Sequence, residues 1–171
     1  MHQLPAGERA EAPLQKNLTA PRVASVWWWA APAVTVACDQ AAKWAAQHWL
    51  APHHASIPLI PGILHLTYVS NTGAAFGLLR GYSGLFILLA VAIAAWLVTE
   101  LTRGEHPPLS RFALGLMLGG AVGNLIDRLR IGSVIDFIDL RVWPVFNVAD
   151  SAITVGVALL IWLAVRHKPS S

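Results

Sequence analysis

The stretch GLMLGGAVGNLIDR at residues 115–128 decides the fold, because an apolar run, a glycine repeat and a polar end follow one another within it. Gly115, Gly119 and Gly123 recur at every fourth residue, so they lie on one face of a helix. Within a membrane, small residues at this spacing let a second helix approach closely. The stretch therefore predicts a membrane helix with a packing seam along one face.

The composition of the whole chain is typical of a membrane protein. Of its 171 residues, 56% are hydrophobic and only 12% are charged, whereas soluble domains contain about 45–50% apolar and about 25% charged residues. The net charge of +3 is too small for a nucleic-acid-binding surface, and the single Cys38 excludes an intrachain disulfide. A cleavable lipoprotein-type signal ending at Cys38 is disfavoured, because Thr35 fits that cleavage box poorly.

We predict an all-α membrane protein with four transmembrane helices and a small β-rich element at the outer face. Apolar length places the spans at about 23–50, 83–101, 112–128 and 148–165, in a single membrane-embedded domain at 23–166. The outer β element covers about 51–81, where residues 63–69 alternate as in a strand. Residues 1–22 are predicted to be a disordered cytoplasmic tail, and residues 167–171 a second cytoplasmic tail.

The distribution of Lys and Arg predicts the orientation. If both termini are cytoplasmic, seven Lys and Arg residues lie inside and four lie outside, as the positive-inside rule requires. All five aspartates then lie at or near the outer ends of the spans: Asp39, Asp127, Asp136, Asp139 and Asp150.

Placing an ionisable residue within a membrane costs free energy, so each such residue is expected to be paired or functional. Asp39 and Lys43 have the i,i+4 spacing of a helical ion pair, which either neutralises itself at the helix end or supports a nearby site. Asn124, Asp127 and Arg128 share one face of the last turn of their helix, as an interfacial anchor or as part of a site.

Two carboxylates in a low-dielectric site share a proton, so that one is a base toward water and the other an acid toward a leaving amide nitrogen. This is the chemistry of aspartic peptidases. The spacing leaves the pair open among Asp127, Asp136, Asp139 and Asp150. Asn147 or Asp150 is also suited to cap the fourth span, but capping does not explain Asp136 between two apolar residues.

The segment Asn71-Thr72-Gly73 is typical of a tight turn, and its amides are also suited to hold a substrate peptide. The sequence contains neither a Gly-x-Ser-x-Gly nor a His-Glu-x-x-His motif, which disfavours a serine mechanism and a zinc site.

Taken together, five motifs in this order resemble the lipoprotein signal peptidase family, also called signal peptidase II, over about residues 23–166. They are Asp39-x-x-x-Lys43, Asn71-Thr72-Gly73-Ala74-Ala75-Phe76, Gly123-Asn124-x-x-Asp127-Arg128, Val134-Ile135-Asp136-Phe137 and Phe146-Asn147-x-Ala149-Asp150. The resemblance implies an inner-membrane aspartic endopeptidase that removes signal peptides from bacterial prolipoproteins, before a cysteine that carries a diacylglyceryl group.

The resemblance also implies roles for particular residues. The catalytic pair is Asp136 and Asp150, and Asp139 is a bystander. The residues that support the site or bind substrate are Asp39, Lys43, Asn71, Gly73, Asn124, Asp127, Arg128 and Asn147. No metal or organic cofactor is expected; the partners are diacylglyceryl-modified prolipoproteins and membrane lipid, and the protein is expected to be a monomer with its active site toward the outer face.

Two alternatives come from other classes. A small proton-coupled transporter also uses intramembrane Asp, Lys and Arg residues, but it places them near the bilayer middle and often in repeated halves. A non-enzymatic assembly subunit built on the glycine seam leaves Asp136 and Asp150 without a purpose.

Overall fold

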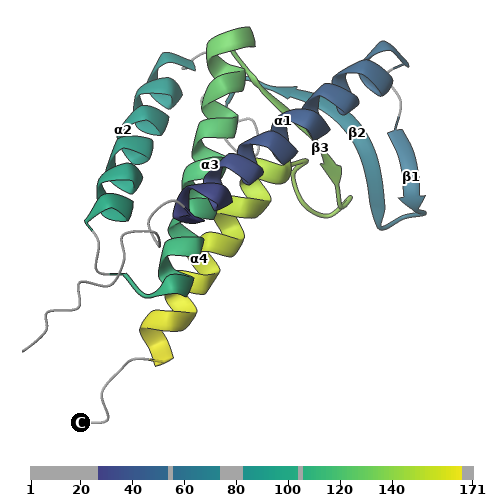
Figure 1. Ribbon diagram of the computed structural model, residues 1–171. Coiled ribbons are helices and arrows are strands. Elements are labelled where there is room, and N and C mark those ends of the chain that lie inside the picture. The colour runs from purple at the N-terminus through teal and green to yellow at the C-terminus, as the bar shows by residue number, and fades with distance from the viewer. Residues whose placement is uncertain (1–26, 54–55, 74–82, 104–105, 167–171) are drawn as a thin grey trace, which may run out of the picture.

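A computed structural model describes residues 27–53, 56–73, 83–103 and 106–166, so both predicted tails lie outside the described residues. In chain order the elements are the 3₁₀ helix η2 (Trp27–Trp29), α1 (Ala30–Trp49), the 3₁₀ helix η3 (Ala51–His53), β1 (Ser56–Ile60), β2 (Leu64–Asn71), α2 (Ser83–Thr102), α3 (Pro108–Ile131), β3 (Val134–Asp139) and α4 (Val148–Arg166) (Figure 1). The described chain is therefore mostly helical.

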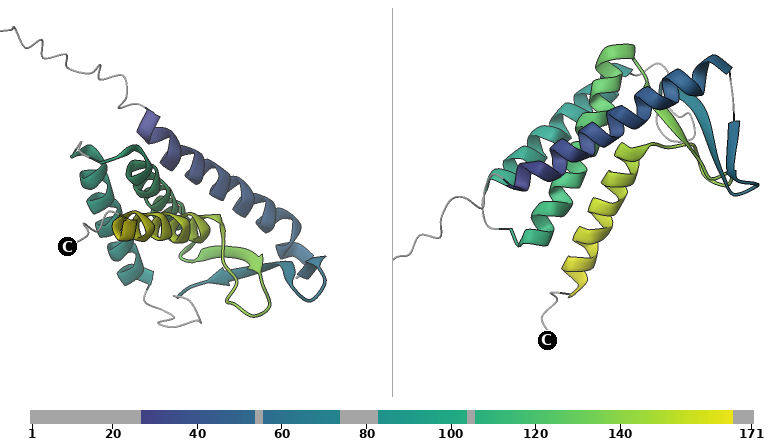
Figure 2. Two further views of the ribbon diagram at one scale, coloured as in Figure 1. Left: turned by 90° about the horizontal axis from the view of Figure 1, so that it is seen from below. Right: turned by 45° about the vertical axis from the view of Figure 1, so that its right-hand side comes forward.

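Helix α3 is the centre of the bundle. It packs against each of the other three long helices, and α1 crosses it at a slant on the way to the sheet (Figure 1). Seen from below, α1 and α2 lie on opposite sides of α3 and α4 (Figure 2). We call the end where α3 finishes and α4 begins the sheet end, and the opposite end of the bundle the far end.

Both boundaries of α3 follow from its sequence. Pro108 opens the helix, where its missing N–H has no partner to lose. Gly132 closes it with a φ of 74°, a left-handed conformation that glycine adopts without steric cost. These signals make α3 longer than the predicted span at 112–128.

The glycine seam predicted on α3 is confirmed, and it faces α1. A methyl group added to Gly119 would lie 2.6 Å from Cβ of Thr35, and one added to Gly115 would lie 3.0 Å from Cβ of Ala31. Gly120 faces α4 instead, against the carbonyl of Ala149. Two helices thus approach α3 so closely that only glycine fits at the contacts.

Three of the four predicted spans are confirmed by length and composition: α2, α3 and α4 are each long and apolar enough to cross a membrane. Helix α1 has the length but not the composition, because Asp39, Gln40 and Lys43 interrupt its apolar run. The exposed faces of α2 and α4 are apolar, with side chains such as Leu88, Trp96 and Ile161 on the surface. Such faces suit contact with hydrocarbon rather than water.

The predicted β-rich element forms an antiparallel sheet in the order β1-β2-β3. Its third strand comes from outside the predicted 51–81 region. Strand β3 pairs with β2 so that Asp136 lies opposite Val69 and Val134 lies opposite Asn71. This pairing brings the end of β2 beside the segment that links α3 to α4.

Two apolar clusters hold the helices and the sheet together. Between α2 and α3, the cluster consists of Leu97, Leu101, Leu114 and Leu118. Between the end of α1 and the sheet, it consists of Ala46, Leu50 and Phe137. Phe137 follows Asp136 in β3, and alternate strand residues point to opposite faces. The second cluster therefore fixes the face of β3 that carries the aspartate.

Candidate active site

Asp136 lies in the middle of β3 and is 2% exposed. Both of its carboxylate oxygens accept hydrogen bonds from asparagine side chains. Asn147 Nδ2 donates to Oδ1 at 2.7 Å, and Asn71 Nδ2 donates to Oδ2 at 3.0 Å. The carboxylate is thus held in one orientation from two elements.

Asp150 lies in the first turn of α4, where it forms a reciprocal cap with Asn147. The backbone N–H of Asp150 donates to Asn147 Oδ1 at 2.9 Å, and the backbone N–H of Asn147 donates to Asp150 Oδ2 at 3.3 Å. This is the geometry of a capping box. Capping and site membership, which the sequence presented as competing explanations, therefore coexist in the same two residues.

The two carboxylates share one pocket. Its volume is about 270 Å³, and besides Asp136 and Asp150 its lining includes Asn71, Gly73, Asn124, Arg128, Val134 and the segment 143–146. Asn147 bridges the two carboxylates, because its side chain contacts Asp136 and its backbone N–H contacts Asp150. Residues from β2, α3, β3 and α4 therefore converge on one cavity.

Lys43 fixes which way the Asn124 amide points. Its ammonium donates to Asn124 Oδ1 at 2.8 Å, and an ammonium can only donate. The other end of the amide, Nδ2, then faces Asp150 and donates to its Oδ1 at 2.8 Å. Asn147 Nδ2 also donates to Asn124 Oδ1, at 3.1 Å. The orientation of these amides supplies N–H donors to both carboxylates.

Behind this layer lies a buried charge cluster made of Asp39, Lys43 and Asp127. Lys43 Nζ is 2.8 Å from Asp39 Oδ2 and 2.9 Å from Asp127 Oδ2. With Asn124, these contacts use all three N–H bonds of the ammonium. The i,i+4 pair predicted in α1 is confirmed, and Asp127 joins it from α3.

The two carboxylates of the cluster also hold backbone. Asp39 Oδ1 accepts the N–H of Ala149, the residue before Asp150, at 2.8 Å. Asp127 Oδ2 accepts the N–H of Ile135, the residue before Asp136, at 3.1 Å. The cluster therefore fixes the chain immediately beside each carboxylate in the pocket.

Gln40 is a member of this cluster that sequence reasoning missed. Its Nε2 donates to Asp39 and to Asp127, at 3.2 Å each, and to the carbonyl of Gly123 at 3.1 Å. The available signal was its place between Asp39 and Lys43, as a third polar residue within an apolar helix.

The remaining candidates fall into two groups. Gly73 donates its N–H to Asn71 Oδ1 at 3.0 Å, so the predicted turn and the site coincide at this point; Ala74 to Phe76 lie outside the described residues. Arg128 lines the pocket, with its guanidinium 5.3 Å from the centre of the Phe86 ring. Asp139, by contrast, is the last residue of β3 and does not line the pocket.

Burial raises the pKa of Asp136 to about 6; the hydrogen bond from Asn71 opposes the rise, and the neighbouring charge of Asp150 adds to it. A carboxyl group with this pKa gains and loses a proton near neutral pH, as acid–base catalysis requires. Among the described residues, no three His, Cys, Asp or Glu side chains converge as metal ligands would. Two adjacent carboxyl groups held by amide donors are suited to proton transfer between water and a peptide bond.

An apolar helical bundle with such a pair of carboxyl groups at one end defines a membrane enzyme of the aspartic peptidase class. A family model described as signal peptidase (SPase) II matches residues 32–166. The chain therefore belongs to the signal peptidase II family. The transporter and assembly-subunit alternatives are wrong.

Relatives and solved structures agree with this assignment. The lipoprotein signal peptidase of Moorella thermoacetica is 49% identical over 131 residues, which cover 75% of this chain and 86% of the relative. That of Pelotomaculum thermopropionicum is 46% identical over 140 residues, which cover 81% and 91%. A bacterial membrane enzyme solved at 2.3 Å resolution superposes with a TM-score of 0.74 at 30% identity, over 85% of this chain and 93% of that one.

Proposed function

We propose that Asp136 and Asp150 are the catalytic pair of this enzyme. As a member of the signal peptidase II family, the chain is an aspartic endopeptidase that removes signal peptides from prolipoproteins. The observation that carries the assignment is the shared pocket in which Asn147 bridges these two carboxylates. Asp127 is fully engaged with Lys43 and backbone, and Asp139 does not line the pocket, so neither competes for the role.

The proposed reaction has two proton transfers. One carboxylate takes a proton from water while the water oxygen attacks the scissile carbonyl carbon, and the other carboxyl group donates a proton to the departing amide nitrogen. The scissile bond is the one before the diacylglyceryl-modified cysteine. Hydrogen bonds from Asn71, Asn124 and Asn147 hold the carboxyl oxygens toward the pocket, where water and substrate meet.

Arg128 and Gly73 are proposed to contact the substrate backbone. The guanidinium of Arg128 lines the pocket and, among the described residues, makes one long hydrogen bond, of 3.4 Å to the carbonyl of Asn124. Its remaining N–H groups are suited to a substrate carbonyl oxygen. Gly73 lets an extended peptide approach the end of β2, because it has no side chain.

A second cavity leads away from the pocket along α4. This apolar groove of about 420 Å³ shares Trp143, Phe146 and Asp150 with the pocket and continues past Ser151, Thr154 and Val155. We assign the groove to an apolar part of the substrate. Because α4 continues into the membrane, such a substrate reaches Asp150 without leaving the hydrocarbon.

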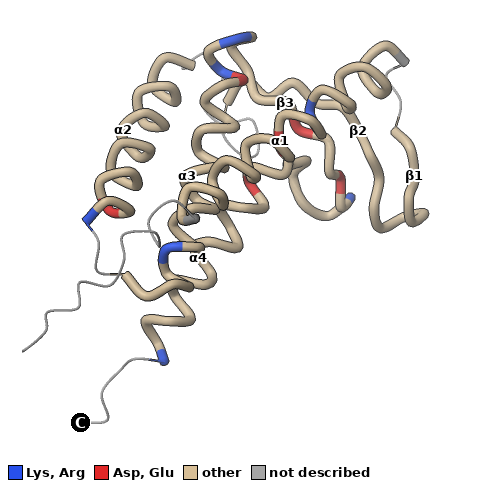
Figure 3. The backbone as a smooth tube through the Cα atoms, in the orientation of Figure 1, with Lys and Arg blue, Asp and Glu red and all other residues tan. Residues whose placement is uncertain are grey.

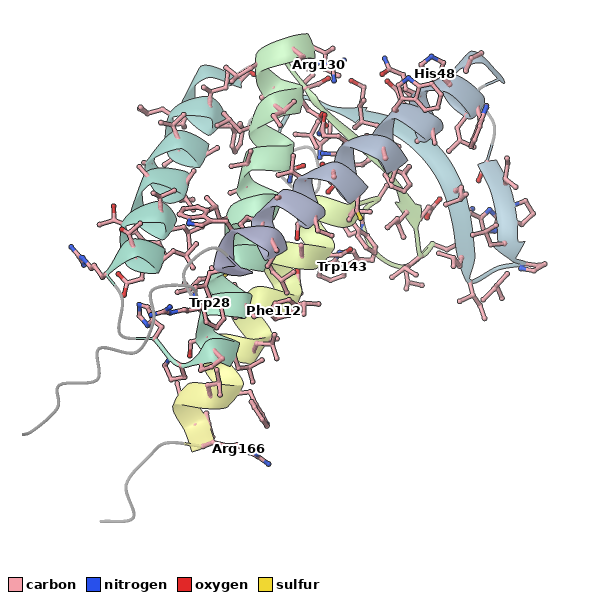
Figure 4. The ribbon with its side chains drawn as sticks, in the orientation of Figure 1. Trp28, His48, Phe112, Arg130, Trp143 and Arg166 are labelled. Atoms are coloured by element: carbon pink, nitrogen blue, oxygen red, sulfur yellow. The ribbon has the colours of Figure 1, made fainter. Side chains whose placement is uncertain are left out.

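We further propose that α1 is a fourth span and that both termini are cytoplasmic. The charged side chains of α1 point into the protein, where Asp39 is 0% and Lys43 is 1% exposed. The distribution of positive charge along the sequence supports the orientation, because seven Lys and Arg residues fall on the side of the two termini and four on the opposite side; Arg166 lies at the far end, where α4 finishes (Figure 4). The active site then lies toward the outer face.

At that face, the sheet is proposed to rest on the membrane surface. Its first strand and the following turn expose the apolar side chains of Ile57, Leu59, Ile60 and Ile63. Exposed apolar groups of this kind suit the interface between headgroups and acyl chains. Membrane lipid is therefore a proposed partner, and the protein is proposed to act as a monomer.

The test of the catalytic pair is cleavage of a diacylglyceryl-modified prolipoprotein by purified enzyme in detergent. Asp136→Asn and Asp150→Asn should each lower the rate on the order of 10³-fold or more, because each removes a proton donor or acceptor while keeping the shape of the side chain. Glu100→Gln, at the far end, is the matched control and should keep the wild-type rate. Wild-type activity in either aspartate variant contradicts the assignment.

A further inference from the structure

The loop between β3 and α4 forms one wall of the active-site pocket. Ile138 and Phe146 close its base with reciprocal backbone hydrogen bonds of 2.8 and 3.0 Å. Trp143 and Phe146 then line both the pocket and the apolar groove, so this loop stands between the two cavities. Figure 4 shows Trp143 on the loop beside the first turns of α4.

A strained turn at Arg141 sets the path of this loop. Arg141 has a φ of 65°, and it is the one described residue other than glycine with a positive φ. Across it, the N–H of Val142 donates to the carbonyl of Leu140 at 2.8 Å, which closes a three-residue turn. Turns of this hand are rare and strained for residues with a side chain, so they persist only where their surroundings hold them.

Asp139 stabilises this turn through three hydrogen bonds. Its Oδ1 accepts the N–H of Arg141 at 2.8 Å, and its Oδ2 accepts the Arg141 guanidinium at 3.1 Å and the Thr67 hydroxyl at 3.0 Å. Burial raises the pKa of Asp139, but the hydrogen bonds from Arg141 and Thr67 outweigh this effect and leave the pKa below its usual value. The carboxylate is therefore charged at neutral pH, which strengthens all three hydrogen bonds.

We propose that Asp139 and Arg141 are positioning residues for the peptidase reaction: they clamp the strained turn so that Trp143 and Phe146 form the wall between the catalytic pocket and the apolar groove. This proposal departs from the expectation that Asp139 is a bystander. The proposal rests on the proposed function, because the wall matters only if substrate occupies these cavities. Thr67 ties the clamp to β2, so the wall and the sheet keep a fixed relation.

The proposal predicts an effect on substrate binding rather than on the chemical step. Asp139→Ala removes the acceptor of all three hydrogen bonds and should raise KM for the prolipoprotein about 10-fold, with kcat within about 2-fold of wild type, as expected for lost ground-state and transition-state binding alike. Asp139→Asn keeps an oxygen for the Arg141 N–H and should recover part of the affinity. Arg103→Gln, which removes an exposed ion pair at the far end, is the matched control and should leave KM unchanged.

A double-mutant cycle separates positioning from a general loss of structure. If Asp139 acts through the wall, Asp139→Ala should add little to the KM of a Trp143→Ala variant, because the wall is already gone. Fully additive effects, an unchanged KM, or a fall in kcat that parallels the melting temperature would each overturn the proposal. Failure of the proposed function is a different result, since the wild-type enzyme would then not need Asp136 and Asp150 for cleavage.

Discussion

The sheet end of the helical bundle contains a buried cluster of ion pairs, whereas the far end contains an exposed ion pair. At the sheet end, Lys43 is 1% exposed and its ammonium lies within 2.9 Å of Asp39 and Asp127. At the far end, the Arg103 side chain is 69% exposed, and its guanidinium lies 3.5 Å from Glu100. Figure 3 shows that charged residues occur at both ends of the bundle. Exposed pairs contribute little to stability, whereas a buried charge without its partner is very costly.

Removing Lys43 is the most severe way to test this comparison. Lys43→Met leaves the buried carboxylates of Asp39 and Asp127 without a counter-charge and should lower the free energy of unfolding by about 3–5 kcal/mol. Arg103→Gln, at the far end, should change it by less than about 1 kcal/mol. Thermal unfolding of both variants in detergent measures the difference. Equal melting temperatures would contradict the contrast between the two ends.

A change of pH should affect the sheet end through Asp136. Its folded pKa of about 6 lies above that of an unfolded aspartate, so the folded state binds the proton more tightly. Stability should therefore fall as the pH rises from about 4 to about 6, by up to about 3 kcal/mol. The measurement is the melting temperature at pH 5 and at pH 7.5. The Asp136→Asn variant has no titratable group at this position, so it should lose the part of the pH dependence that Asp136 contributes. A pH profile identical to that of the wild type would contradict this assignment.

A methyl group added at Gly123 tests how tightly the buried charge cluster is packed. The added carbon of Gly123→Ala would lie 2.6 Å from Asp39 Oδ2, so the charge cluster must shift, and the melting temperature should fall by an amount equivalent to about 1–3 kcal/mol. Gly84→Ala in α2 meets nothing within 4 Å and is the matched control. A neutral Gly123→Ala variant would show that the cluster tolerates displacement.

The sequence predicted the helices and strands better than it predicted the contacts between them. Apolar length located α2, α3 and α4, and alternation located β2, because these signals depend on neighbours along the chain. The pair Asp39 and Lys43 was predictable from i,i+4 spacing, but Asp127 joins it only because α1 packs on the glycine seam of α3. Contacts of this kind depend on how helices cross, which local pattern does not encode.

The same distinction explains the outcomes at the site. Resemblance singled out Asn124 and Asn147, but their amide orientations follow from the position of Lys43 in another helix. The strained turn at Arg141 carries no sequence signal, because its sequence contains neither glycine nor asparagine to mark a left-handed residue. Asp139 therefore stayed outside the predicted site.

The segment from α3 through β3 to α4 has a consequence for the order of folding. The hydrogen bonds within this segment join residues that are close in the sequence: Asp127 and Ile135 are 8 residues apart, Asp136 and Asn147 are 11 apart, and Asn124 and Asp150 are 26 apart. The contacts from α1 span 81 and 110 residues. Short-range contacts form at a lower entropic cost than long-range ones. We therefore expect the carboxylate pair to assemble late in synthesis from one contiguous hairpin, and the first helix made to dock last, when Lys43 meets Asn124 and orients it.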